Sequence, residues 1–497
     1  MAGYVSMNET QAAVRIPEFG GLWQYGDGVD ADPRYAVECV NALTTQGVLR
    51  PMAACEQLAD TLPDPIETLA RLHRRYYAHS EDKDVLIAAA GGQLYCRSPR
   101  GEMWNRIPIP PEMAAEEYQM SRWSCVSYEM NPEDSDAPVD VLLLSNAKDG
   151  MICVRGDTLT AFVVPTPKKF GVIARHAERI WGGAITDDPD LLMYSAPYDP
   201  FDWEANAEFP EDGAGDVLHP SWDGDSFAAL SSFGSQLVAL KRGRIWRVLG
   251  THPGEYVFKE QYGGGAPCAD TIAVAGNRIL MLGRGGLWQY DGESAAPFLQ
   301  EYAQAVFERV NQETVNQACA CLWGDTYYCA LPLDGSRINN AVLMYHTVEK
   351  RFLLREGVCV GAFLPMEDTL FFTSATRPGT LWKWQEDSLL SGMAVPMRWV
   401  GPWQEMGSKN RLKCGFALYA TVECTQEVWL KIGVETEKGI RFKRIVFQPP
   451  LPGKHARQRR LTFGGKGRRF RLVLESQGSV PWRMLGGLQL EAEVEAD

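Results

Sequence analysis

Carboxylates are the side chains in this sequence whose spacing comes nearest to a catalytic pattern. The stretch TDDPDLLMYSAPYDPFDW contains five aspartates: Asp187, Asp188, Asp190, Asp199 and Asp202. A glycosidase needs two carboxylates flanking the bond that it cleaves, and carboxylates here or at Asp223 and Asp225 could bind calcium. However, aspartates in proline-rich stretches usually cap turns or stay solvated, and no complete calcium-binding loop is present. The pattern therefore favours turn structure over catalysis.

Other catalytic and cofactor patterns are weaker still. The seven histidines show neither HxH nor HExxH spacing, and no glycine-rich stretch carries the GK[ST] of a phosphate-binding loop. The twelve cysteines include no CxxC pair, which predicts buried thiols in a reducing compartment. Cys319 and Cys321 have no accompanying ligand pattern. We therefore expect no enzyme activity, no bound metal and no cofactor.

The charge of the chain is unevenly distributed. Residues 395–497 contain 18 Lys and Arg against 10 Asp and Glu, a net charge of +8, so the total of −14 leaves −22 for residues 1–394. Six arginines stand out in the basic part: Arg457, Arg459, Arg460, Arg468, Arg469 and Arg471. On alternating strands many of them would share one face, where like charges repel. We predict an interface with a partner of opposite charge. The acidic body of a neighbouring copy is the first candidate, and DNA phosphate is the second.

The elements that would position these residues are short strands. A strand–turn–strand pattern recurs seven times, for example as QLVALKRGRIWRV and RILMLGRGGLWQY. The second strands of these units begin at Leu94, Met151, Leu191, Arg244, Leu287, Val342 and Leu381. Such a loose period with β patterning is typical of propeller blades of four strands. The sequence predicts an all-β fold with a β-propeller of about seven blades. Six or eight blades stay open, and a sandwich of unrelated hairpins is the alternative.

The propeller is expected to cover residues 61–395. Trp246, Trp288 and Trp382 follow their turn glycines in the same way and should occupy equivalent blade positions. A helical pattern predicts an insertion over residues 297–318, whereas residues 66–79 fit either an amphipathic helix or the first propeller strand. The residues GGLWQY occur twice, at 20–25 and 285–290. The first copy lacks an apolar partner strand, so residues 1–60 are predicted to form a segment that docks on the propeller or on a neighbour.

The C-terminal part has its own pattern. Residues 396–497 contain six or more short stretches that alternate apolar and polar residues, such as VWLKIGVET and IRFKRIVFQ. They predict a small β-sandwich or jelly roll. At the other end, MAGYVSMNETQ has neither the basic head nor the apolar core of a signal peptide, and no stretch approaches 18–20 apolar residues. We expect no membrane span and no export by the ordinary route.

Three stretches resemble the propeller core of a family of tailed-bacteriophage proteins: ERIWGGAITDDPDLLMYSAPYDPFDW, SWDGDSFAALSSFGSQLVALKRGRIWRVLG and APCADTIAVAGNRILMLGRGGLWQYDG. The family is that of the tail nozzle or tail-hub proteins of short-tailed phages, also called tail tubular protein B. ECVNALTTQGVLRPM and WVGPWQEMGSKNRLKCGFALYATV fit the same pattern. The resemblance therefore covers residues 16–494.

The resemblance implies a structural virion protein, made in the host cytoplasm, with six copies forming a ring at the distal end of the tail. DNA would leave through this ring without specific binding, and an acidic body suits that role because it repels phosphate. Tail adaptor and tail fibre or tailspike proteins would be its partners. The chain is shorter than the large nozzles, which puts in doubt any receptor-contacting domain at the tip.

Two other functions stand beside the nozzle. One is a carbohydrate-binding or carbohydrate-cleaving propeller with an accessory sandwich, and the other is a cytosolic scaffold propeller. Sialidase repeats of the form Ser-x-Asp-x-Gly-x-x-Trp are absent from the sequence, as are WD dipeptides at repeat ends. Exposed aromatic residues on loop tips would favour the carbohydrate function, whereas large surfaces between subunits would favour the nozzle.

Overall fold

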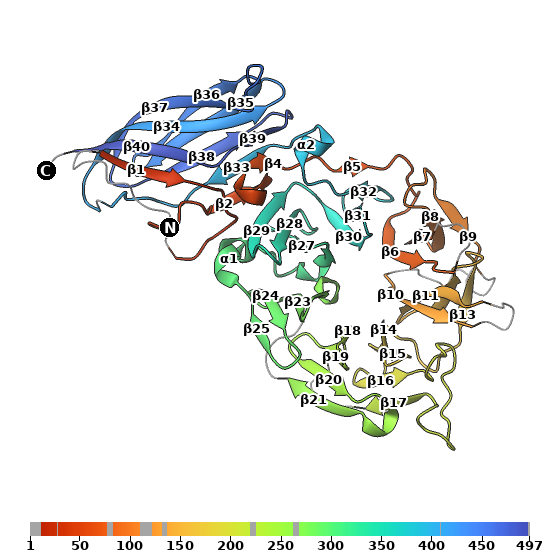
Figure 1. Cartoon of the computed structure of the whole chain (residues 1–497). Coiled ribbons are helices and arrows are strands. Elements are labelled where there is room, and N and C mark those ends of the chain that lie inside the picture. The colour runs from red at the N-terminus through yellow and green to blue at the C-terminus, as the bar shows by residue number, and fades with distance from the viewer. Residues whose placement is uncertain are drawn as a thin grey trace.

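The computed structural model describes residues 11–26, 28–76, 83–109, 122–131, 137–218, 225–261, 268–407 and 409–495. Its strands form a ring of seven four-stranded blades with a two-layered β domain attached at one side (Figure 1). Six blades are separate four-stranded sheets, and the seventh is the first part of a nine-stranded sheet. The predicted propeller followed by a C-terminal sandwich is therefore confirmed.

Each blade is an antiparallel meander that runs outward from the axis. Blades 1 to 3 contain β6 (Ile66–His73), β7 (Asp84–Ala90), β8 (Gln93–Arg97) and β9 (Asn105–Ile107); β10 (Ser124–Met130), β11 (Val139–Asn146), β12 (Gly150–Arg155) and β13 (Ala161–Val164); and β14 (Val172–His176), β15 (Arg179–Gly183), β16 (Leu191–Tyr194) and β17 (Gly215–Leu218). The open alternative at residues 66–79 is thus resolved in favour of a strand, β6; residues 77–79 lie outside the described residues.

Blades 4 to 7 repeat the arrangement. They contain β18 (Ala229–Phe233), β19 (Gln236–Leu240), β20 (Ile245–Leu249) and β21 (Val257–Gln261); β22 (Ala273–Ala275), β23 (Arg278–Gly283), β24 (Gly286–Tyr290) and β25 (Ala295–Pro297); β26 (Cys319–Trp323), β27 (Thr326–Leu331), β28 (Ala341–His346) and β29 (Arg351–Glu356); and β30 (Val360–Pro365), β31 (Leu370–Ser374) and β32 (Leu381–Lys383) with β5 (Glu56–Gln57). The seven predicted second strands are the third strands of the seven blades.

The ring is closed by a strand from the N-terminal part of the chain. β5 precedes blade 1 in sequence but pairs with β32 as the outer strand of blade 7, with Gln57 opposite Trp382. The inner strands of blades 7 and 1, β30 and β6, are in contact. Blade 7 is therefore built from both ends of the propeller sequence, and the propeller begins before residue 61.

The attached domain is a sandwich joined to the propeller through a shared sheet. One layer contains β1 (Gln11–Ile16), β40 (Leu488–Val494), β34 (Lys413–Cys424) and β37 (Arg457–Gly467), with β39 (Trp482–Met484) also paired to β34. The other layer contains β2 (Glu38–Val40), β33 (Met397–Val400), β38 (Phe470–Ser476), β35 (Val428–Thr436) and β36 (Gly439–Phe447). Because β2 pairs with β29 of blade 6, this layer continues the blade, and one apolar core runs through both parts.

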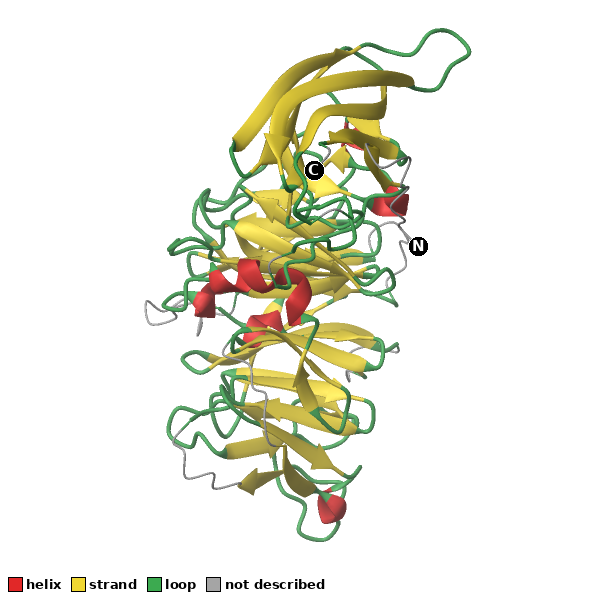
Figure 2. Ribbon diagram, turned by 90° about the vertical axis from the view of Figure 1, so that its left-hand side faces the viewer, coloured by secondary structure: helices red, strands yellow, loops and turns green. Residues whose placement is uncertain are grey.

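The predicted helical insertion is shorter than its sequence pattern. The helix α1 covers Gln300–Glu308, and a 3-10 turn follows at Val315–Gln317. Between them Val310 forms a bridge with Leu333 next to blade 6, so tertiary pairing interrupts the helical periodicity. Two short strands, β3 (Ala42–Leu43) and β4 (Arg50–Pro51), a 3-10 turn at Thr45–Gly47 and the helix α2 (Ser388–Ser391) lie where propeller and sandwich join (Figures 1 and 2).

The two GGLWQY copies have different environments. In the second copy Gly285, with φ of +81°, lies in the turn between β23 and β24, where glycine is favoured. In the first copy the Leu22 amide donates a hydrogen bond of 2.9 Å to the Phe352 carbonyl of β29. A Cβ added to Gly21 would lie 2.4 Å from that same carbonyl oxygen. The first glycine pair therefore allows close backbone approach to blade 6 and forms no hairpin.

Gly21→Ala is therefore expected to destabilise the protein by about 1–3 kcal/mol, because the methyl group would overlap a backbone atom that cannot move independently. Gly243→Ala is the matched control, since Gly243 lies in a blade turn and a Cβ there would meet no atom within 4 Å. Urea denaturation of both variants measures the difference. Equal stability of the two would contradict the close packing of Gly21.

Candidate interaction surface

Basic side chains gather where both sheets of the sandwich end. β36 is the last strand of the nine-stranded sheet, β37 is the last strand of the other layer, and the two strands are in contact. Six exposed cations lie on them. Lys466 of β37 forms an ion pair with Glu495, and the other five are Arg441, Lys443 and Arg444 on β36 and Arg459 and Arg460 on β37. We call these five residues the basic edge.

Three cations of the basic edge contact aromatic side chains in place of carboxylates. The Arg444 guanidinium lies 4.3 Å from the Trp429 ring centre, and Lys443 Nζ lies 5.6 Å from that of Phe463. Arg460 Nε donates a hydrogen bond of 3.0 Å to the Tyr419 hydroxyl. Among the described residues, none of the five cations forms an ion pair with an acid. The positive charge of this edge is therefore not neutralised within the chain.

The six arginines expected to form an interface do not share one face. Arg457, Arg459 and Arg460 belong to β37, Arg468 and Arg469 lie in the turn after it, and Arg471 belongs to β38 in the other layer. The chain crosses from one sheet to the other between β37 and β38, so the alternation of side chains along a strand cannot place all six arginines on one face. The expectation that many of the six share one face is therefore wrong for Arg471, which lies in the other layer.

Three of these arginines are engaged within the chain. Arg471 Nε donates a hydrogen bond of 2.7 Å to Glu435 and its guanidinium lies 4.6 Å from the Trp403 ring centre. Arg469 lies over the same ring at 5.2 Å, and Arg457 Nε donates to the Pro449 carbonyl at 2.9 Å. Arg459, Arg460 and Arg468, all three exposed, remain as interface candidates. The β36 residues were not predicted from the sequence, although IRFKRIVFQ shows the same basic alternation.

Four of the five aspartates of blade 3 have separate structural roles. Asp188 pairs with Lys168 at 2.6 Å, and Asp190 pairs with the buried Lys241 of blade 4 at 2.5 Å. Asp199 and Asp202 each accept a backbone hydrogen bond from a residue two positions later, which is the turn-capping pattern. Asp187 is exposed. Of the other suggested calcium ligands, Asp225 pairs with Arg242 and Asp223 lies outside the described residues.

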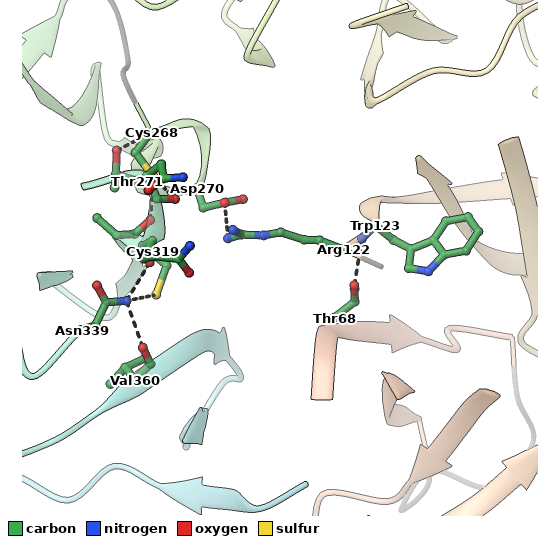
Figure 3. Close-up of polar contacts among 12 residues, drawn as sticks. Thr68, Arg122, Trp123, Cys268, Asp270, Thr271, Cys319, Asn339 and Val360 are labelled. Carbon is green, nitrogen blue, oxygen red and sulfur yellow. Dashed lines mark hydrogen bonds and ion pairs between the residues drawn. The ribbon is translucent and has the colours of Figure 1, made fainter. Parts of the chain in front are cut away.

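An ion pair spans the axis of the propeller. Arg122, directly before the inner strand of blade 2, reaches across to Asp270, directly before the inner strand of blade 5 (Figure 3). Their backbones are fixed on each side: the Trp123 amide donates 2.8 Å to Thr68 Oγ1, and the Thr271 hydroxyl donates 2.8 Å to the Cys268 carbonyl. A channel that one arginine can span is narrower than duplex DNA, whose major groove alone is about 12 Å wide.

A pocket of about 310 Å³, lined by both apolar and charged side chains, lies between blades 6 and 7. Tyr328 donates a hydrogen bond to the Glu386 carboxyl group, and Arg351 lines the same pocket. Burial raises the pKa of Glu386, although the hydrogen bond from Tyr328 and the charge of Arg351 act in the opposite direction. Sequence patterns could not reveal this pocket, because its residues come from blade 6, blade 7 and the N-terminal segment.

Glu386→Gln is expected to gain stability relative to the wild type as the pH rises. Below the ordinary value near 4.5 the carboxyl group is protonated in both folded and unfolded chains. Above pH 4.5 the carboxyl group ionises in the unfolded chain, while the raised pKa keeps it protonated in the folded chain. The free energy of unfolding of the wild type therefore falls as the pH rises, until the carboxyl group ionises in the folded chain as well. Urea denaturation of both proteins between pH 4.5 and 8 measures this difference. A difference that is constant or shrinks with pH would contradict the assignment.

The described residues contain neither a metal-binding cluster nor a membrane-spanning helix. Within the ranges given above, no group of three or more His, Cys, Asp or Glu is arranged to hold a metal ion. No helix in those ranges is long and apolar enough to cross a membrane. All twelve cysteines are described and are free thiols, eight of them buried.

Comparisons with known proteins locate similar folds only. No family model and no curated protein matches the chain. Similar solved structures include BBS1N in complex with ARL6DN (TM-score 0.41, 10% identity, 67% of this chain and 96% of that chain) and the Pan2 WD40 domain of Neurospora crassa (0.37, 8%, 64% and 89%). PorZ of the type-IX secretion system of Porphyromonas gingivalis is a third (0.38, 9%, 79% and 46%). At these TM-scores the comparisons say nothing about function, and the propeller assignment depends on strand connectivity.

Proposed function

We propose that this chain is a structural subunit of a bacteriophage tail that assembles with copies of itself into a ring around the path of exiting DNA. The observation that supports assembly is the contrast in charge within the chain. The basic edge lies in the C-terminal part, whereas residues 1–394 carry a net charge of −22. Exposed cations without acidic partners repel one another, and an acidic surface of a second copy relieves this repulsion.

The DNA path in this proposal lies between copies. The propeller axis is too narrow for a duplex at the level of Arg122 and Asp270, so a conduit needs several chains around a common opening. The six-fold copy number, the tail adaptor and the tail fibre or tailspike partners come from the family resemblance of the sequence. The acidic propeller would repel the passing phosphates and so disfavour tight binding.

Negative-stain images of the purified, concentrated protein test this function. Rings of uniform diameter with an open centre are expected at low salt. Single propellers with one attached sandwich, at all protein concentrations and at low as well as moderate salt, would contradict the proposal.

A carbohydrate-cleaving propeller is the second candidate, supported by the pocket between blades 6 and 7. Glu367 and Glu386 both line this pocket, together with the aromatic ring of Trp323. A carboxyl group with a raised pKa is the form that a general acid needs. Release of reducing sugar from a bacterial surface polysaccharide, lost in Glu386→Gln, would establish this activity in place of a purely structural role.

A further inference from the structure

A long ordered loop leaves the propeller on blade 3. Residues 195–214 connect β16 to β17, a span of 20 residues without helix or strand. Loops of this length inside a compact domain are uncommon and are usually either functional or disordered. The loop and its flanking strand end carry seven acids and no base between residues 198 and 218: Asp199, Asp202, Glu204, Glu208, Glu211, Asp212 and Asp216. We call residues 198–218 the acidic loop.

The acidic loop is held in one conformation by a buried cation. Arg179 is 2% exposed, and its guanidinium donates hydrogen bonds to the carbonyl oxygens of Ser195 at 2.7 Å and Gly213 at 2.6 Å, and to that of Glu211. Trp203 packs against Phe170 of the blade, with ring centres 4.9 Å apart. The loop therefore presents its acids from a preformed scaffold, which lowers the entropy cost of binding.

The surface of the acidic loop is unneutralised and partly apolar. All seven carboxylates are exposed, and within the described residues none of them forms an ion pair. Tyr198, Phe209 and Leu218 are 75%, 50% and 62% exposed. The basic edge has the opposite charge and its own exposed apolar neighbours, Trp429 and Ile440, at 44% and 38%. Exposed apolar residues rimmed by polar side chains mark interaction sites, and interacting surfaces carry complementary charge.

The acidic loop and the basic edge cannot meet within one chain. Blade 3 lies across the ring from blade 6, to which the sandwich is attached, and the sandwich and β17 lie at opposite ends of the molecule (Figure 1). Building on the proposed self-assembly, we infer that the acidic loop of one copy docks on the basic edge of the next. This contact is head-to-tail, and repeated head-to-tail contacts produce a closed ring when the rotation closes.

Two charge-reversal variants test this pairing. In the loop variant, Glu204, Glu208, Glu211 and Asp212 are changed to Lys. In the edge variant, Arg441, Lys443, Arg459 and Arg460 are changed to Glu. Each variant then presents like charges on both surfaces, so each alone should sediment as a folded monomer. Mixed in equal amounts, the two should assemble again, because each loop would meet an edge of opposite charge.

A control variant carries the same change in net charge elsewhere. Glu308, Glu313, Glu367 and Asp368 are exposed acids outside the loop, and their change to Lys should leave assembly intact. The pairing would be overturned if the loop variant assembled as well as this control. It would also be overturned if the mixture of the loop and edge variants failed to assemble. If the edge variant dissociates but the loop variant still assembles, the ring proposal stands and the acidic loop is excluded as the surface that binds the basic edge. A wild-type monomer at low salt would overturn both proposals.

Discussion

Reversing four charges of the basic edge is expected to convert the assembled protein into folded monomers. The edge variant removes the attraction of Arg441, Lys443, Arg459 and Arg460 for an acidic neighbour and replaces it with repulsion. An exposed ion pair contributes up to about 1 kcal/mol, so four lost pairs weaken association by roughly a thousandfold. Sedimentation velocity at fixed concentration and low salt measures the change.

A charge-preserving variant separates charge from shape in this experiment. Exchanging Arg for Lys and Lys for Arg at the same four positions retains the net charge, and it should retain assembly with only a small loss of affinity. Raising the salt concentration should dissociate the wild type, because exposed charges are screened within about 10 Å at 0.1 M. Wild-type assembly that is insensitive to both salt and charge reversal would exclude the basic edge as the contact.

Trp246→Ala is expected to reduce the free energy of unfolding by about 3–5 kcal/mol, the usual cost of emptying a large aromatic site. Trp246 is 3% exposed and packs with Trp181 and Leu237 between blades 3 and 4. Trp288 and Trp382 are only half-buried, so their replacement should cost clearly less. Urea denaturation of the three variants gives the ranking, and an equal loss for all three would contradict it.

The three tryptophans nevertheless occupy equivalent positions, as the turn glycines predicted. Each lies on the third strand of its blade and pairs with a residue near the end of the second strand: Trp246 with Ala239, Trp288 with Met281 and Trp382 with Phe372. Their exposure differs because the neighbouring blades supply different residues. Sequence spacing can therefore identify a blade position, whereas burial depends on contacts between blades.

The repeated hairpins were predictable because each pairs strands that are close in sequence. The closing strand β5 was not, since two exposed residues carry no periodic pattern and their partner, β32, lies more than 300 positions away. The same reason hides β2, whose few residues join blade 6 to the sandwich. The pairing of such short strands depends on the neighbouring strands of the folded sheet, so no local sequence pattern predicts it.

The basic edge was predictable in charge but not in position. Composition identified a basic C-terminal part, and Arg459 and Arg460 do lie on its exposed edge. Strand pairing placed Arg471 beside Glu435 in the other layer, which no local pattern indicates. Arg122 is a single residue outside any motif, and its partner Asp270 is nearly 150 positions away.

Native mass spectrometry of the wild-type protein from a low-salt solution tests the central claim most directly, because it counts the chains in each assembly. Ring formation predicts one dominant mass, a fixed multiple of the 55.3 kDa chain, which stays unchanged as the protein concentration rises. A spectrum containing only monomers at every concentration, or an open-ended series of increasing multiples, would contradict a closed ring.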